Sequence, residues 1–115
     1  MKRLIRASAD RNYYLLDVTL AGQSILTEPV EGYGRDLASA GQDVLEDIQN
    51  DLRILNTEDL GNGRFAVTIG FDEDGTIFVP GISKTYKIRT DSLQDAETEA
   101  IYNVIHQLHA KRWRR

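Results

Sequence analysis

Apolar and polar residues alternate along much of the chain, which is the pattern of half-buried β-strands. From Tyr14 to Leu20 the even positions are apolar, whereas the odd positions include Asp17 and Thr19. The same alternation follows the dipeptide Asn62-Gly63, which is a strong turn signal. These patterns predict strands at residues 4–8, 14–20, 24–27, 65–71 and 83–89. A second turn signal, Asp74-Gly75, leads into residues 76–79, and Pro80-Gly81 separates them from the last strand.

Two other segments have the period of amphipathic helices. The first is expected to run from about Asp36 to Leu55, with Gly41 close to its buried face so that the helix can approach a sheet. Its predicted apolar stripe consists of Leu37, Val44, Ile48, Leu52 and Leu55. The second helix is capped by Asp91 or Ser92. Its predicted stripe consists of Leu93, Ala100, Ile101, Val104 and Leu108.

The element order is therefore βββαββα, which predicts an α+β fold. Short connections between most strands favour an antiparallel sheet of about five strands with both helices on one face. A chain of 115 residues is the usual size of one domain, so we expect residues 1–115 to form a single core. Any fraying is expected only in the basic tail, residues 111–115.

Composition indicates the class of protein and its cellular compartment. The chain is 41% apolar and has two prolines, which is typical of ordered globular proteins. It has no cysteine, which excludes disulfides and thiolate metal sites and suits a reducing cytoplasm. Polar residues interrupt the basic N-terminal region, and no segment approaches the roughly 20 apolar residues of a membrane span. We expect a soluble, cytoplasmic protein without a membrane partner.

Charge is segregated along the chain. Residues 28–74 contain twelve acidic and three basic residues, whereas both ends carry net positive charge, within a total of −4. Such a field acts on encounter and partner choice, so the pattern indicates binding of charged macromolecules rather than a reaction.

Carboxylates of the first helix are predicted to form an acidic ridge. Asp36, Asp43 and Asp47 are expected opposite the apolar stripe, with Glu46 and Asp51 on its flanks. Carboxylates four residues apart lie about 6 Å apart along a helix, comparable to the spacing of phosphates in nucleic acid, so the ridge can mimic nucleic acid in a basic groove. The alternative is a solvated helix face. The acidic area is enlarged by Glu58, Asp59 and the loop residues Asp72, Glu73 and Asp74.

A basic and aromatic row is predicted at the end of the second helix. Tyr102, His106, His109 and Trp113 follow at spacings of four, three and four, away from the buried stripe. Beside them are Lys111, Arg112, Arg114 and Arg115. Such residues stack on bases, neutralise phosphates or anchor a protein interface. The alternative is that Trp113 packs on the sheet edge and the tail is a basic helix end.

Signals for catalysis and cofactors are poor. His106 and His109 lack a third ligand at metal-binding spacing, and the run Asp72-Glu73-Asp74-Gly75 lacks the glutamate that closes a calcium loop. Gly32-Tyr33-Gly34 and Gly61-Asn62-Gly63 do not have the context of phosphate loops. We predict no catalytic residues, no metal and no cofactor.

Residues 1–8, the segment 13–18 and Gly32-Tyr33-Gly34 together carry a family resemblance. They resemble small type II-A anti-CRISPR proteins of plasmids and phages, and residues 59–67 and 79–86 resemble a subset of that family. It implies a stoichiometric inhibitor of the RNA-guided effector nuclease, whose positively charged channels suit an acidic ridge. The family has no common catalytic motif.

The leading hypothesis is a non-enzymatic anti-CRISPR inhibitor in the cytoplasm of a bacterial host. In this hypothesis the protein binds the type II effector nuclease and blocks guide-RNA loading or nucleic-acid engagement. Direct contact with the guide RNA is a second form of the same hypothesis. A second hypothesis is an RNA-binding or RNA-cleaving mobile-element protein that uses the basic aromatic row. A third is a structural or regulatory plasmid protein. Monomer and homodimer both remain open.

Overall fold

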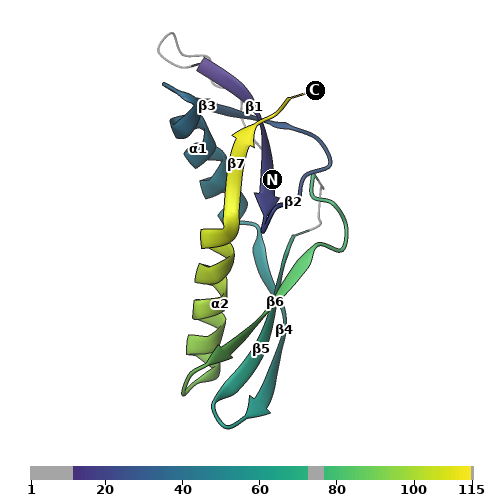
Figure 1. The fold of residues 1–115 in the computed structure, drawn as a ribbon, viewed down its shortest axis with the longest axis vertical. Helices are drawn as coiled ribbons and strands as arrows, with labels where there is room; N and C mark the ends of the chain where they lie inside the picture. Colours follow the sequence, from purple (N-terminus) through teal and green to yellow (C-terminus); the bar gives the residue numbers. More distant parts are fainter. Residues whose placement is uncertain (1–11, 73–76, 115) are drawn as a thin grey trace.

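The computed structural model describes residues 12–72 and 77–114, which form two antiparallel sheets and two helices (Figure 1). The predicted α+β class, with antiparallel strands, is confirmed. The strand number and order differ from the prediction, because the strands divide into a four-stranded and a three-stranded sheet. The predicted strand at residues 4–8 lies outside the described residues. In chain order the elements are β1 (Asn12–Leu20), β2 (Gln23–Ser24), β3 (Val30–Gly34), α1 (Leu37–Gln49), β4 (Leu52–Gly61), β5 (Arg64–Phe71), β6 (Ser83–Arg89), α2 (Leu93–Gln107) and β7 (Leu108–Arg112).

The first sheet is built around β1. On one side, β1 pairs with β3 through residues 12–16 and then with β2 through residues 19–20. On the other side, residues 16–20 of β1 pair with β7. The predicted alternation is confirmed, since Leu16 and Val18 are fully buried while Tyr13 and Leu15 on the other face are exposed. Helix α1 covers the buried face.

The second sheet has the order β4-β5-β6 and is covered by α2. Its central strand buries Phe65, Val67, Ile69 and Phe71, as the alternation predicts. The hairpin between β4 and β5 turns at Asn62 and Gly63, which both have positive φ angles of 56° and 71°. This conformation explains the Asn-Gly dipeptide, because both central residues of this turn type need positive φ.

The first helix is shorter than predicted. It ends at Gln49, where the backbone N–H of Asn50 bonds to the carbonyls of Asp47 and Ile48, and β4 begins at Leu52. Leu52 and Leu55 fit a helical stripe by spacing, but they belong to β4, which pairs with β5, a strand distant from α1 in sequence; Leu52 pairs with Phe71, and Leu55 lies at a register shift of the ladder. Leu55 remains 56% exposed and lies over Gly70 on the uncovered face of the second sheet.

The second helix passes directly into a strand. Leu108 has extended angles, φ −75° and ψ 133°, and begins β7 without an intervening loop. The basic tail is therefore not a frayed helix end, because Lys111 and Arg112 pair with β1 and the N–H of Trp113 donates to the carbonyl of Leu15 at 2.8 Å. Figure 1 shows α2 and β7 as one continuous yellow-green path that joins the two sheets.

The two sheets share one hydrophobic core. Residues 25–27 and 77–79 are hydrogen-bonded to each other between the sheets, and Phe71 stacks on Phe78 with ring centroids 4.8 Å apart. The molecule measures 55 × 24 × 22 Å, so the sheets follow each other along its long axis (Figure 1). The expected single sheet with both helices on one face is thus replaced by two sheets, each with its own helix. No helix in the described ranges has the length and apolar character that a membrane span requires.

Candidate partner-binding surfaces

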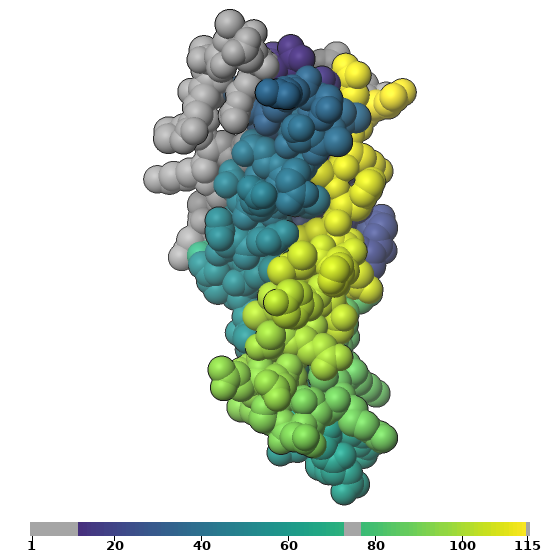
Figure 2. Space-filling view, turned by 90° about the vertical axis from the view of Figure 1, so that its left-hand side faces the viewer, coloured from purple at the N-terminus to yellow at the C-terminus, as the bar shows by residue number. Residues whose placement is uncertain are grey.

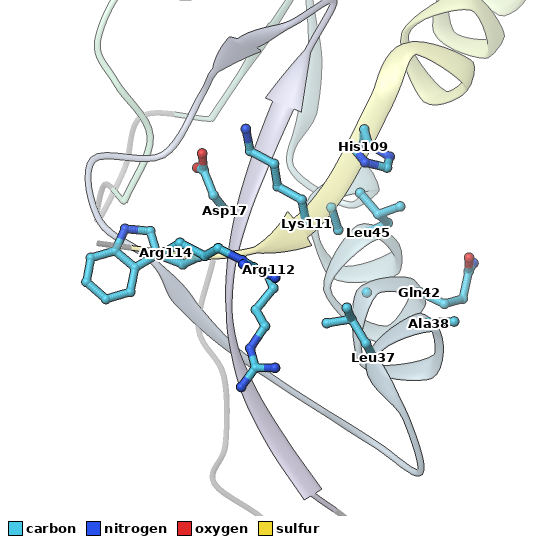
Figure 3. A pocket seen from close by; sticks show the side chains of 12 residues that line it. Asp17, Leu37, Ala38, Gln42, Leu45, His109, Lys111, Arg112 and Arg114 are labelled. Carbon is cyan, nitrogen blue, oxygen red and sulfur yellow. The ribbon is translucent and has the colours of Figure 1, made fainter.

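An open groove of about 970 Å³ runs between α1 and β7. The space-filling view shows the two elements side by side, with α1 in blue and β7 in yellow (Figure 2). In Figure 3, Leu37 and Leu45 of α1 lie opposite the side chains of β7, the cationic strand. The groove is lined by Asp17, Leu37, Ala38, Gly41, Gln42, Leu45 and residues 109–114.

The groove arises from unequal packing of α1 on the first sheet. On the β3 side, Gly32 and Gly34 allow the helix to approach so closely that an added Cβ would lie 2.7 Å from the backbone of Ala40. On the β7 side, a Cβ at Gly41 would lie 3.4 Å from the Cβ of Ala110, at ordinary contact distance. The close approach predicted at Gly41 therefore occurs at the β3 glycines, and small residues leave the β7 side hollow.

The predicted basic aromatic row is divided between a helix and a strand. Tyr102 and His106 are exposed on α2, whereas His109 and Lys111 belong to β7, where side chains alternate every two residues. Cross-strand pairing places Lys111 beside Asp17 and His109 beside Thr19 on the sheet face away from α1. The helical spacing of this row is wrong because the helix ends at Gln107.

The remaining members of the row extend along the same edge. Arg112 lies on the α1 side, with its guanidinium carbon 5.8 Å from the ring centroid of Tyr14, within the range of a cation–π contact. Trp113 is half-buried and Arg114 is exposed, while Arg115 lies outside the described residues. Three cationic side chains thus stand along this edge of the groove: Lys111, Arg112 and Arg114.

The acidic residues of α1 do not form the predicted ridge opposite the apolar stripe. The buried residues of the helix are Ala40, Gly41, Val44 and Ile48, and this rotates Asp43 and Asp47 to a half-buried flank. Asp43 accepts a hydrogen bond of 3.4 Å from the N–H of Tyr33 in β3. Among the acidic residues within the helix, only Glu46 is exposed, and it accepts a hydrogen bond from the amide of Gln42.

The ends of the predicted ridge have other roles. Asp36 is the N-cap of α1, and the backbone N–H of Ser39 donates to it at 2.8 Å, which lowers the pKa of the Asp36 carboxyl. Asp51 follows the helix in a turn, and Asp72 forms an ion pair of 3.0 Å with Arg53. This pairing reduces the free negative charge at Asp72, and Glu73 and Asp74 lie outside the described residues.

Helix α1 therefore separates two kinds of surface. Its β3 flank carries Asp43 and Asp47, and its β7 flank lines the groove beside the cationic strand. The groove itself was not predicted from the sequence, because Leu37 was assigned to the buried stripe although its side chain is 40% exposed. The signal that could have revealed it is the run of small residues at one side of α1, Ala38 and Gly41.

A search of the described residues for metal-binding groups and a comparison of the chain with known proteins both gave no match. Within residues 12–72 and 77–114, no group of three His, Asp or Glu side chains could hold a metal ion. Comparison with protein-family models, with curated proteins and with solved structures finds no match for this chain.

Proposed function

We propose that this protein is a non-catalytic inhibitor of a type II RNA-guided effector nuclease in the cytoplasm of a bacterial host. The proposal begins from the resemblance of residues 1–8, 13–18 and 32–34 to type II-A anti-CRISPR proteins. It holds that the protein binds the nuclease and blocks guide-RNA loading or nucleic-acid engagement.

The observation that carries the proposal is the position of opposite charges on the two flanks of α1. Asp43, Glu46 and Asp47 give the β3 flank and the crest of the helix negative charge, whereas Lys111 and Arg114 lie beyond its β7 flank. An effector nuclease holds guide and target in positively charged channels, which attract the carboxylates. The cationic strand can then engage acidic protein surface or guide RNA beside the channel.

Capture of purified effector nuclease, with and without loaded guide RNA, tests this function. We expect stoichiometric retention by the guide-free enzyme, with guide RNA as a competitor. Glu46→Lys combined with Asp47→Lys should weaken retention at least tenfold, because it reverses charge on the proposed contact. The matched control is Glu99→Lys, which reverses an exposed carboxylate on α2. Absence of retention in both states of the nuclease would reject the proposal.

A second candidate is an RNA-binding protein. It is favoured by Tyr102, which is 59% exposed on α2 one turn before His106, since exposed aromatic side chains can stack on bases. A gel shift with guide RNA alone separates the two functions. Tight binding or cleavage of RNA without nuclease, lost in Tyr102→Ala, would favour this candidate.

A further inference from the structure

The outer edge of β7 carries unpaired backbone groups. In the described part of the chain, β7 pairs with β1 and with no other strand. The N–H of Trp113 donates to the carbonyl of Leu15 at 2.8 Å, and the N–H of Ala21 donates to the carbonyl of Gln107 at 3.3 Å. Because bonded and non-bonded pairs alternate in antiparallel sheets, residues 109 and 111 direct their backbone groups to β1. Ala110 and Arg112 therefore direct N–H and C=O outward.

This edge has few of the features that usually prevent strand pairing. The β1–β7 register is continuous, without a bulge, and β7 contains no proline. Its protection is charge alone, from Lys111, Arg112 and Arg114. Antiparallel pairing of two β7 strands would bring these cations against each other, which disfavours a second copy of this chain. The same cations attract a strand that carries carboxylates.

The groove supplies a second recognition element beside the edge. A strand added to β7 would direct alternate side chains towards α1, where Leu37, Ala38 and Leu45 form an apolar wall. Its other side chains would lie on the face of His109 and Lys111. The phosphates of an RNA backbone only accept hydrogen bonds and cannot pair with the outward carbonyls, and the 2′-hydroxyls do not alternate with them as peptide N–H and C=O groups do. An extended peptide matches both the donors and the acceptors of the edge.

We infer that the β7 edge and the α1–β7 groove form a strand-addition site for an extended acidic peptide segment with alternating apolar and carboxylate side chains. This inference does not require the partner to be an effector nuclease. A peptide can therefore bind even if the nuclease does not, and the two proposals fail separately.

Hydrogen exchange with a short peptide of alternating valine and glutamate tests the site directly. We expect the amides of Ala110 and Arg112 to become at least tenfold more protected, while the amide of Lys111, already bonded to β1, changes little. A peptide N-methylated on the nitrogens that face β7 should lose this protection and bind at least tenfold more weakly. Equal binding by the N-methylated peptide would overturn the inference, as would absence of binding by the unmodified one.

Variants test the same contacts from the protein side. Ala110→Pro removes an outward N–H and leaves the β1 ladder intact, so peptide binding should fall at least tenfold, whereas Ala110→Ser retains the donor and the affinity. Lys111→Glu combined with Arg114→Glu should also weaken peptide binding. The control Lys87→Glu, at an exposed position of β6, should not. Thermal unfolding establishes that each variant is folded. If Ala110→Pro does not fold, the loss of binding by the N-methylated peptide to the unchanged protein tests the same backbone hydrogen bonds. A short RNA that displaces the peptide and protects the same amides, or self-association through β7, would contradict the inference.

Discussion

Two glycines of β3 determine how closely α1 approaches the first sheet. At Gly32, an added Cβ would lie 2.6 Å from Cδ1 of Leu16 and 2.7 Å from the carbonyl oxygen of Ala40. The backbone carbonyl cannot move aside without displacing the helix. Gly41 has no such constraint, although it is the glycine within α1 itself.

Gly32→Ala and Gly41→Ala should therefore change stability in opposite directions. We expect Gly32→Ala to lower the free energy of unfolding by about 1–3 kcal/mol through overpacking. Gly41→Ala should raise it by up to about 1 kcal/mol, because alanine favours the helix and its Cβ finds ordinary contact distance at Ala110. Urea unfolding of both variants measures the difference, and equal effects would show that the helix does not approach the sheet through β3.

The cap at Asp36 makes the stability of α1 dependent on pH. Hydrogen bonds from Ser39 lower the pKa of Asp36 from its ordinary value of 3.8, so the folded protein favours the carboxylate. This contribution is complete above the unfolded pKa and is lost as the pH falls through the lower folded pKa. The free energy of unfolding of the wild type relative to Asp36→Asn should therefore fall below about pH 3.8. Thermal unfolding across the acidic range measures it, and parallel curves would contradict the role of the carboxylate.

The junction of α2 and β7 joins the second sheet to the first. Leu108 is only 7% exposed where the helix becomes a strand, whereas Leu93 at the start of α2 is 49% exposed. Both residues fit one predicted stripe, but Leu93, the first residue of α2, lies at the edge of the core. The burial of Leu108 therefore holds both elements in place.

The same truncation at these two leucines should have unequal costs. Leu108→Ala should lower the free energy of unfolding by about 2–5 kcal/mol, as expected for a buried leucine. Leu93→Ala should cost about 1 kcal/mol or less, because half of its surface is already in water. Chemical unfolding compares them, and similar losses would mean that α2 is buried along its whole length.

The whole molecule is longer than a compact chain of its size. Its radius of gyration is 15.9 Å over Cα atoms, whereas a compact domain of this length has about 13 Å. The two sheets succeed each other instead of stacking, and this arrangement leaves each sheet with one face uncovered by a helix. An extended shape gives a small protein more surface for a large partner.

Small-angle X-ray scattering should therefore give a radius of gyration near 16 Å at low concentration, with a maximum dimension well above that of a sphere. A value near 13 Å would mean that the two sheets fold against each other. A radius that rises with concentration would indicate self-association. Self-association through the edge of β7 would contradict the inference that this edge takes an acidic peptide.

The sequence was sufficient where a signal is local. Alternation predicted the buried faces of β1 and β5, and the Asn62-Gly63 dipeptide predicted a turn, because period and turn chemistry are properties of neighbouring residues. It also predicted where each helix begins, at about Asp36 and after a cap at Asp91 or Ser92, and the structure has N-caps at Asp36 and Ser92. The C-terminal row stays a prediction as a binding site, and its helical geometry was wrong.

Only the tertiary structure decided the secondary structure of residues that fit two patterns. Leu52 and Leu55 match a helical stripe, and pairing with β5 makes them part of a strand. His109 and Trp113 match a helical row, and pairing with β1 starts a strand at Leu108. In both places a hydrogen-bonded partner distant in the chain overrides local preference. The sequence alone determined the α+β class and the buried faces of β1 and β5. The contacts between distant strands decided the two sheets, the groove beside α1 and the open edge of β7.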